Sequence, residues 1–119
     1  MEPDFRWTEG KEATLVFALD QPEDLTLKMR ILPFIREVLW KQQRISVELN
    51  GVAIDSLVLS QNKEVELSLS LPGYLLRRQN ILKFKLPDAA SPELLQLSTD
   101  QRLLGFAVYW IRFDRKVTT

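Results

Sequence analysis

The sequence predicts an all-β fold, an antiparallel β-sandwich of about eight strands with jelly-roll-like connections. Apolar and polar residues alternate with a period of two along most of the chain. Clusters of Gly, Pro, Asn and Asp interrupt the alternation at intervals of about ten residues, which is typical of sandwiches and barrels. Two longer irregular segments, 33–43 and 88–105, have the length of the crossovers that a jelly roll needs.

The length of the chain fits one domain. A chain of 119 residues can bury a core of its own, so we expect residues 1–119 to form a single domain. The apolar fraction of 45% and the charged fraction of 27% are those of an ordinary folding chain. A methionine directly ahead of an apparent strand is also what a domain excised from a larger protein looks like, and we expect this chain to be one.

The individual strands follow from the alternation. In segment 25–31 four apolar side chains share one face, and Thr26, Lys28 and Arg30 share the other. Trp7 opens a first strand, and the same pattern predicts further strands at 12–19, 25–31, 44–50, 52–60, 63–72, 80–87 and 106–113.

Four details refine this prediction. The Asn50-Gly51 pair predicts a two-residue hairpin. The apolar phase slips across Asp55-Ser56, which indicates either a β-bulge or a bend between two sheets. A short helical turn is expected at 74–78. The last strand is apolar on both faces, and strict alternation groups Tyr109 with its neighbours Ala107, Ile111 and Phe113.

Composition excludes several classes of function. Sixteen Lys and Arg balance sixteen Asp and Glu, so the net charge is zero and nucleic acid is not an expected partner. The chain contains neither Cys nor His, which excludes disulfides, thiolate nucleophiles and Ser-His-Asp triads. No segment is apolar over enough residues to span a membrane, and no signal peptide is recognisable. We therefore expect no enzyme activity, no cofactor and no direct membrane span in this segment.

Three charged groupings each have a simple structural explanation beside a functional one. Glu64 and Glu66 share a strand face, so their carboxylates could approach the separation of a glycosidase pair. A strand face exposed to solvent explains the same two residues. The turn at 20–24 carries three acidic residues that could hold calcium, although turn formation alone explains its composition. The basic residues at 77–78, 83 and 85 form a local patch of the kind that could contact single-stranded nucleic acid, which zero net charge disfavours.

Two tryptophans are candidate ligand contacts. Sugar-binding sandwiches stack pyranose rings on exposed aromatic side chains and fix the hydroxyl groups with polar neighbours. Trp40 lies in the first crossover beside Gln42, and Trp110 shares a strand face with Arg112. We expect this pair of tryptophans to be exposed, and we predict Trp40, Gln42, Trp110 and Arg112 as ligand-binding residues.

The second crossover carries residues that we expect to be structural. Ser91-Pro92-Glu93 is typical of a helix start, with Ser91 as the N-cap. Leu94, Leu95 and Leu97 would then cover the edge of the sandwich. Asp100 and Arg102 are two residues apart, where an ion pair and bonds to the backbone would fasten the loop against the sheet.

The order of several short motifs carries a family resemblance that covers nearly the whole chain. The chain resembles a poorly characterised β-sandwich domain appended to bacterial membrane proteins and glycosyltransferases of cell-surface polysaccharide. The family often has glycine where this chain has Gln79 and Leu95. The shared motifs are Trp7, Asn50-Gly51, Pro72, Asn80, Pro87-Asp88, Ser91-Pro92, Asp100, Arg102, Leu104 and Gly105.

The resemblance implies a non-catalytic accessory domain, and two functions stay open. In the first, the domain binds a polysaccharide or a lipid-linked glycan, and Trp40 or Trp110 is exposed near polar side chains. In the second, it is an assembly module that pairs with its parent protein or with a second copy of itself. The second predicts a contiguous exposed apolar patch formed by Phe106, Val108 and Trp110. The resemblance also implies attachment to a bacterial inner-membrane protein, while the compartment itself stays open.

Overall fold

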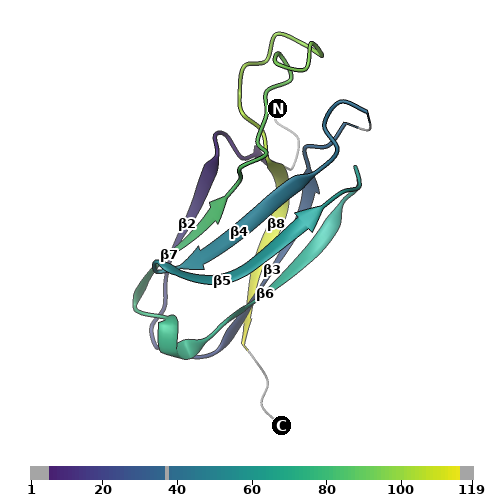
Figure 1. Ribbon diagram of the computed structural model, residues 1–119. Coiled ribbons are helices and arrows are strands. Elements are labelled where there is room, and N and C mark those ends of the chain that lie inside the picture. The colour runs from purple at the N-terminus through teal and green to yellow at the C-terminus, as the bar shows by residue number, and fades with distance from the viewer. Residues whose placement is uncertain (1–5, 37, 116–119) are drawn as a thin grey trace.

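The computed structural model describes residues 6–36 and 38–115 and arranges them in two layers of strands (Figure 1). Each long strand overlaps a segment for which alternation predicts one. Within the described residues the chain forms β1 (Arg6–Trp7), β2 (Glu12–Ala18), β3 (Leu25–Pro33), β4 (Gln43–Leu49), β5 (Val52–Leu59), β6 (Val65–Leu71), the short 3-10 helix η1 (Gly73–Leu75), β7 (Gln79–Lys85) and β8 (Phe106–Arg115).

The strands form two antiparallel sheets with jelly-roll connections. Sheet A has the order β1-β8-β3-β6, and sheet B has the order β2-β7-β4-β5. The pairs β1·β8, β2·β7, β3·β6 and β4·β5 nest inside one another along the chain, and successive pairs alternate between the sheets. One long antiparallel hairpin that rolls up on itself produces this nesting, which defines a jelly roll. The predicted fold class is therefore confirmed.

The core lies between the two sheets, where the inward side chains of both meet. In β3 every second residue is buried, which is the expected pattern for a central strand with one covered face. Sheet B contributes the alternating apolar residues of β4 and β7. The most buried of these core residues include Leu27, Met29, Ile31, Ile45, Val47, Leu49, Leu71, Leu82, Phe84 and Phe106.

The connections divide the molecule into two ends (Figure 1). The upper end carries the β3–β4 and β7–β8 connections, and the lower end carries the β2–β3, β4–β5 and β6–β7 connections. The segments predicted as crossovers do cross between the sheets, because β3 and β8 belong to sheet A while β4 and β7 belong to sheet B. At the lower end, the helical turn predicted at 74–78 occurs slightly earlier, as η1 (Gly73–Leu75).

The β4–β5 hairpin confirms two predictions. Asn50 and Gly51 both have positive φ, 50° and 87°, as a type I′ turn requires. The register then shifts, because Val47 pairs with Asp55 while Glu48 pairs with Ala53. The extra residue is Ile54, so the phase slip is a β-bulge within sheet B and not a bend between sheets.

A second bulge, in β8, makes the predicted grouping of Tyr109 with Ala107, Ile111 and Phe113 on one strand face wrong. Arg30 pairs with Trp110 and Ile31 pairs with Val108, so Tyr109 is an inserted residue. The insertion reverses the alternation, and Ile111 and Phe113 therefore lie on the inner face, with Phe113 against the ring of Phe17 at 4.6 Å between centroids.

The same strand lacks the exposed patch that an assembly module was expected to show. Phe106 has only 1% of its surface exposed, and Val108 packs against the core. Trp110 lies on the opposite, outer face of sheet A as a consequence of the bulge at Tyr109. Phe106, Val108 and Trp110 therefore do not form a contiguous surface.

Candidate functional site

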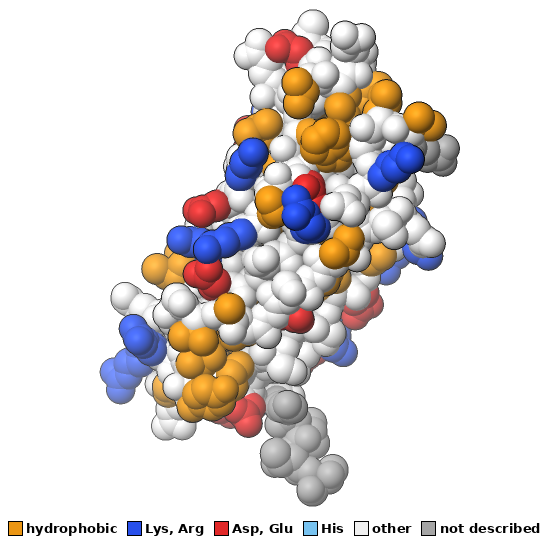
Figure 2. Space-filling view, viewed as in Figure 1, with side chains coloured by type: hydrophobic (Ala, Val, Ile, Leu, Met, Phe, Trp, Pro, Cys, Tyr) orange, Lys and Arg blue, Asp and Glu red, His pale blue; other side chains and the backbone are white. Residues whose placement is uncertain are grey.

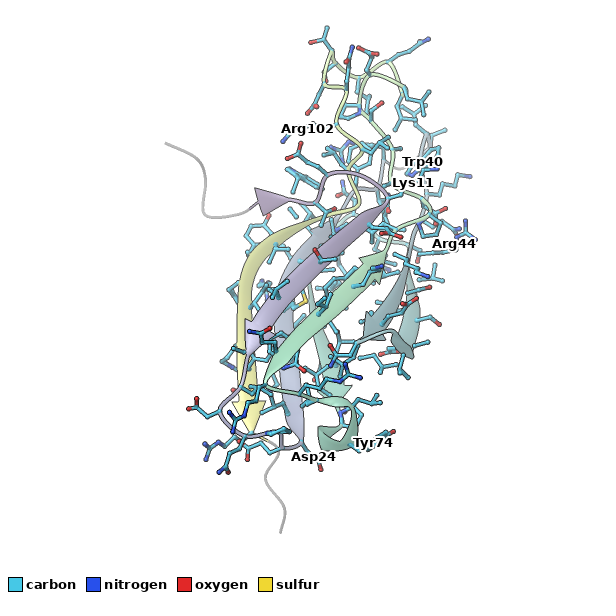
Figure 3. All side chains as sticks on the ribbon, turned by 90° about the vertical axis from the view of Figure 1, so that its left-hand side faces the viewer. Lys11, Asp24, Trp40, Arg44, Tyr74 and Arg102 are labelled. Carbon is cyan, nitrogen blue, oxygen red and sulfur yellow. The ribbon has the colours of Figure 1, made fainter. Side chains whose placement is uncertain are left out.

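Asp88 joins the two crossovers at the upper end. Its backbone carbonyl accepts hydrogen bonds from Trp40 Nε1 at 2.6 Å and from Gln43 Nε2 at 3.0 Å. Its carboxylate accepts from Arg44 Nε at 2.9 Å and Arg44 Nη2 at 2.8 Å. Residues from the β3–β4 connection and the start of β4 thus converge on one residue of the β7–β8 connection, and Figure 3 shows Trp40 and Arg44 at this end.

The charge pair and the buried amide at this junction favour a structural role. The Arg44 guanidinium lowers the pKa of the Asp88 carboxyl, and a hydrogen bond from Gln42 adds to the effect. The side chain of Gln43 is fully buried, and its Nε2 also donates to the carbonyl of Phe34 at 2.8 Å. Its Oε1 has no hydrogen-bond partner among the described residues. Two N–H donations fix the orientation of this amide, so it pins one crossover to the other.

These contacts determine how exposed the side chains of Trp40 and Gln42 are. Trp40 is partly buried, packs against a small cluster formed by Phe34, Ala90 and Leu104, and has its indole N–H occupied by the Asp88 carbonyl. The expectation that Trp40 is exposed is therefore wrong. Gln42 stays exposed beside it. Their role in ligand binding stays a prediction.

The tip of the β7–β8 connection is a series of turns where a helix start was predicted. Ser91 Oγ accepts a hydrogen bond from the N–H of Leu94 at 3.0 Å, as an N-cap would. The positive φ of Gln96, 61°, is not helical, so the turns do not continue as a helix. Leu95 packs against the cluster of Phe34, Ala90 and Leu104. Leu94 is 67% exposed and Leu97 is 45% exposed, so the prediction that all three leucines cover the edge of the sandwich is wrong.

Asp100 and Arg102 form a tight pair within this loop. Both carboxylate oxygens of Asp100 accept from the Arg102 guanidinium, over 2.7 to 3.1 Å, and one also accepts from the Arg102 backbone N–H at 3.0 Å. These bonds hold the pKa of Asp100 at about 2. Arg102 lies at the upper end in Figure 3. The role of the pair in fastening the loop stays a prediction.

The other predicted aromatic, Trp110, lies on the outer face of sheet A. It is 37% exposed, and the guanidinium of Arg112 lies 5.5 Å from its ring centroid, in a cation–π contact. The strand register surrounds it with polar side chains. We call this surface the Trp110 face; it consists of Thr26, Lys28, Arg30, Glu66, Ser68, Ser70, Trp110, Arg112 and Asp114.

The charges on the Trp110 face are largely paired. Arg112 Nε donates to Asp114 at 3.1 Å, and Lys28 Nζ lies 4.0 Å from the same carboxylate. Arg30 Nε donates at 2.9 Å to Glu64, the residue just before the start of β6. The face therefore offers guanidinium and carboxylate groups at fixed positions without a strong field of one sign, and such a surface suits a neutral polar ligand.

A second candidate surface, which the sequence did not reveal as a site, is a hollow at the lower end. It has a volume of about 470 Å³ and lies where η1 meets the start of β5 and the end of β6. Tyr74 and Asp24 both line it, and Figure 3 shows them at this end. We call it the lower hollow; its lining is Asp24, Leu25, Val52, Ala53, Ile54, Ser70, Leu71, Pro72, Tyr74 and Leu75.

Only one local signal could have pointed to the lower hollow. Tyr74 follows Pro72-Gly73, so it sits in a turn and has no strand face on which to be buried. Asp24, Val52 and Ser70 come from three other segments, and only the jelly-roll topology brings them together.

The described part of the chain gives no positive indication of a metal site or of a membrane-spanning helix. Among residues 6–36 and 38–115, no group of three or more acidic side chains is arranged to hold a metal ion, and Asp20, Glu23 and Asp24 do not form one. In the same part of the chain, no helix has the length and apolar character needed to cross a bilayer.

Comparison with known proteins finds similarity at the level of structure. No family model matches the chain, and no curated protein sequence matches it. Among solved structures, the CBM36-1 domain of a multidomain xylanase from the hindgut metagenome of Trinervitermes trinervoides is similar, with a TM-score of 0.56, 4% identity and coverage of 96% of this chain and 78% of that one.

Two further similar structures differ in how much of them the chain spans. A C-terminal domain described as a sugar-binding protein, EclA, has a TM-score of 0.53 and 18% identity, with 92% of this chain and 69% of that chain covered. A family GH115 4-O-methyl-α-glucuronidase with specificity for decorated arabinogalactans has a TM-score of 0.60 and 14% identity. The match covers 95% of this chain but only 14% of the glucuronidase. At these identities the likeness establishes the shared β-sandwich fold.

Proposed function

We propose that this domain is a non-catalytic, carbohydrate-binding-like accessory domain that contacts a glycan on the Trp110 face. The observation that carries the proposal is the position of Trp110, which is partly exposed on the outer face of a sheet with Arg112 beside its ring. A large aromatic side chain in such a place is not needed for the core, and it offers an apolar surface within a polar one.

The chemistry of the Trp110 face suits a sugar. The apolar face of a pyranose ring packs on the indole of Trp110, and its hydroxyl groups donate to and accept from charged groups at the edge. Arg30, on β3, pairs directly opposite Trp110, and the Arg112 guanidinium lies against the Trp110 ring. Because these guanidinium groups already have carboxylate partners, we expect a neutral glycan to bind better than an acidic one.

The similar solved structures support the class of ligand. A carbohydrate-binding module of family CBM36, solved with calcium and xylotriose, has a TM-score of 0.50 and 10% identity to this chain, with 92% of this chain and 78% of that chain covered. This structure and the CBM36-1 domain are both carbohydrate-binding modules, one from a xylanase and one solved with xylotriose, so xylan-derived probes are a reasonable starting point. The calcium belongs to that protein and is not carried over to this chain.

The proposed wider setting of the domain rests on the family resemblance alone. We propose that it is attached to a bacterial protein of polysaccharide synthesis, such as a glycosyltransferase, and holds that protein near a polysaccharide or a lipid-linked precursor. Trp40 and Gln42 stay predicted contacts at the upper end. We place the principal contact at Trp110, because the indole N–H of Trp40 is already bonded to Asp88.

Tryptophan fluorescence during titration with defined glycans tests the proposal. The probes are xylotriose, arabinoxylan, dextran and alginate, and the proteins are the native chain, Trp110→Ala and Trp40→Ala. We expect a saturable change with at least one neutral glycan, and we expect calorimetry to show weaker binding of that glycan to Trp110→Ala, which lacks its fluorescent reporter. No response from any glycan, together with concentration-dependent self-association, would contradict the proposal and favour the assembly module.

A further inference from the structure

The lower hollow has the composition of a ligand site. Its walls are apolar side chains of β5 and η1, including Val52, Ile54 and Leu75, and its polar groups are Asp24 and Ser70. Figure 2 shows hydrophobic side chains gathered at this end of the molecule, below the charged middle of sheet B. Pockets for small polar ligands combine an apolar wall with a few fixed polar groups in this way.

Tyr74 is the most conspicuous residue of the lower hollow. It is 87% exposed, more than any other large hydrophobic side chain in the described part of the chain. Exposing a tyrosine ring forgoes the stabilisation that burial would provide. In η1, Leu75 packs partly against the core while Tyr74 does not, so the turn is anchored by its leucine and its tyrosine faces outward. The turn presents the ring at the rim of the hollow, where a ligand can pack on it.

The rim beside Tyr74 is held rigidly. Asp24 Oδ1 accepts a hydrogen bond from the N–H of Gly73 at 2.7 Å, which ties the β2–β3 connection to η1. The two segments approach so closely that a side chain at Gly73 would lie 3.2 Å from Asp24. Asn50 Nδ2 donates to the Leu75 carbonyl at 2.9 Å from the other side. Tyr74 therefore sits between two anchored residues, which reduces the entropy lost when a ligand binds.

We propose that the lower hollow is a second carbohydrate-binding site, specific for neutral sugars. The sugar ring packs on Tyr74, and its hydroxyl groups donate to the Asp24 carboxylate and exchange hydrogen bonds with Ser70. Asp24 is the single charged residue that lines the hollow among the described residues, so the site repels uronic acids and other anionic sugars. The proposal rests on the proposed function, which it extends from one binding surface to two.

Two sites on one small domain change which ligands bind tightly. Ser70 belongs both to the Trp110 face and to the lining of the hollow, so the two sites adjoin on the β6 side of sheet A. A long polysaccharide can occupy both sites, and the second contact is then intramolecular. A trisaccharide has fewer sugar units and gains less from the second contact. We therefore expect tighter binding to polymer than to oligosaccharide, counted per sugar unit.

The test uses affinity electrophoresis in gels that contain arabinoxylan, dextran or alginate, with the full chain. The variants are Tyr74→Ala, Asp24→Asn and Trp110→Ala, with Tyr74→Phe to retain the ring. Ile81→Ala removes a different exposed hydrophobic side chain, on sheet B, and serves as the matched control. Thermal melting of each variant shows that it is folded, and Tyr74→Ala is expected to melt as the native chain does because its side chain is exposed.

The expected result is that Tyr74→Ala and Asp24→Asn each weaken binding to a neutral polymer by about tenfold. Tyr74→Phe and Ile81→Ala should bind as the native chain does. If the native chain binds a polymer, Trp110→Ala loses this binding and Tyr74→Ala keeps it, the second site is overturned and the proposed function stays intact. Stronger binding to alginate than to neutral polymers would overturn the specificity. No binding to any polymer by the native chain would overturn both proposals.

Discussion

Asn50 donates a hydrogen bond from Nδ2 to Oδ1 of Asn80 at 3.0 Å, which joins the β4–β5 turn to the start of β7. Asn80 is fully buried, and it also accepts from the backbone N–H of Arg77 at 2.8 Å and donates to the Arg77 carbonyl at 2.7 Å. Asn50 Oδ1 accepts from the N–H of Ile81 at 2.9 Å. Two asparagines of the sequence motifs thus form one network at the lower end, next to the turn that carries Tyr74.

This network predicts a graded loss of stability at position 50. Asn50→Gly keeps the positive φ of the turn and removes only the side-chain bonds, so the free energy of unfolding should fall by about 2 kcal/mol. Asn50→Ala should cost more, because alanine is strained at a φ of 50°. Urea denaturation of both variants measures the difference. An Asn50→Gly protein as stable as the native chain would show that the side chain does not support the fold.

The junction at Asp88 predicts a stability that depends on pH. Arg44 lowers the pKa of Asp88 in the folded protein, so the pair stabilises the fold fully above the ordinary aspartate pKa of about 3.9. This stabilisation is lost as the pH falls through the lowered folded pKa. Asp88→Asn should therefore lower the melting temperature by several degrees at pH 7, and the gap to the native chain should close at low pH.

A control separates this effect from general acid destabilisation. Asp20→Asn removes an exposed carboxylate from the β2–β3 connection and should leave the melting temperature at pH 7 unchanged. A gap between Asp88→Asn and the native chain that stays constant down to pH 2 would argue against the charge pair as its source.

The Asp100–Arg102 pair predicts an unusually acidic carboxyl group. Because the pKa of Asp100 is about 2, its carboxyl carbon should keep the chemical shift of the ionised form down to pH 3 in an NMR titration. The pair contributes stability above the unfolded pKa and loses it as the pH falls through about 2. Titration near pH 4 would mean that the pair is not formed in solution.

The loop-fastening role of this pair has its own test. Asp100→Ala should lower the melting temperature, because the guanidinium of Arg102 and its backbone N–H lose their shared acceptor. It should not change glycan affinity. If the melting temperature is unchanged while glycan binding weakens, Asp100 belongs to a binding site and the structural account of the loop is wrong.

The close packing around Gly105 predicts that a larger residue there destabilises the fold, and that shortening Leu86 reduces this cost. A Cβ atom at this position would lie 2.7 Å from Leu86 Cδ1 and 3.1 Å from Thr8 Oγ1. Gly105→Ala should therefore destabilise the fold by about 1 to 3 kcal/mol. In a Leu86→Ala background the added methyl group has room, so the same change should cost less. Equal costs in both backgrounds, measured by urea denaturation, would exclude the contact with Leu86 as the cause.

The predictability of the two bulges differs for a physical reason. At Asp55-Ser56 two polar residues interrupt an apolar alternation, so the slip shows in the sequence. In β8 both faces are apolar, since the outer face carries Trp110 and Ala107 is covered as well. An inserted residue leaves no trace in such a pattern, and the grouping of Tyr109 with Ile111 and Phe113 was therefore wrong.

The sites were less predictable than the fold because they depend on distant contacts. Trp40 is neighboured by polar residues in sequence, which suggested exposure, but its partner Asp88 is 48 residues away. The lower hollow combines residues of four segments and has only the turn position of Tyr74 as a local sign. Trp110 and Arg112 were correctly placed on one face, because no bulge lies between them and residues two apart on an uninterrupted strand share a face.

The indole N–H signals of the three tryptophans offer the most direct test of the central claim. In a ¹⁵N-labelled chain, each indole gives its own signal, and single substitutions assign them. During titration with a neutral glycan that binds, the account predicts a saturable shift of the Trp110 signal, while the signal of Trp7 stays in place. Saturable binding that leaves the Trp110 signal unmoved would contradict a glycan site on the Trp110 face.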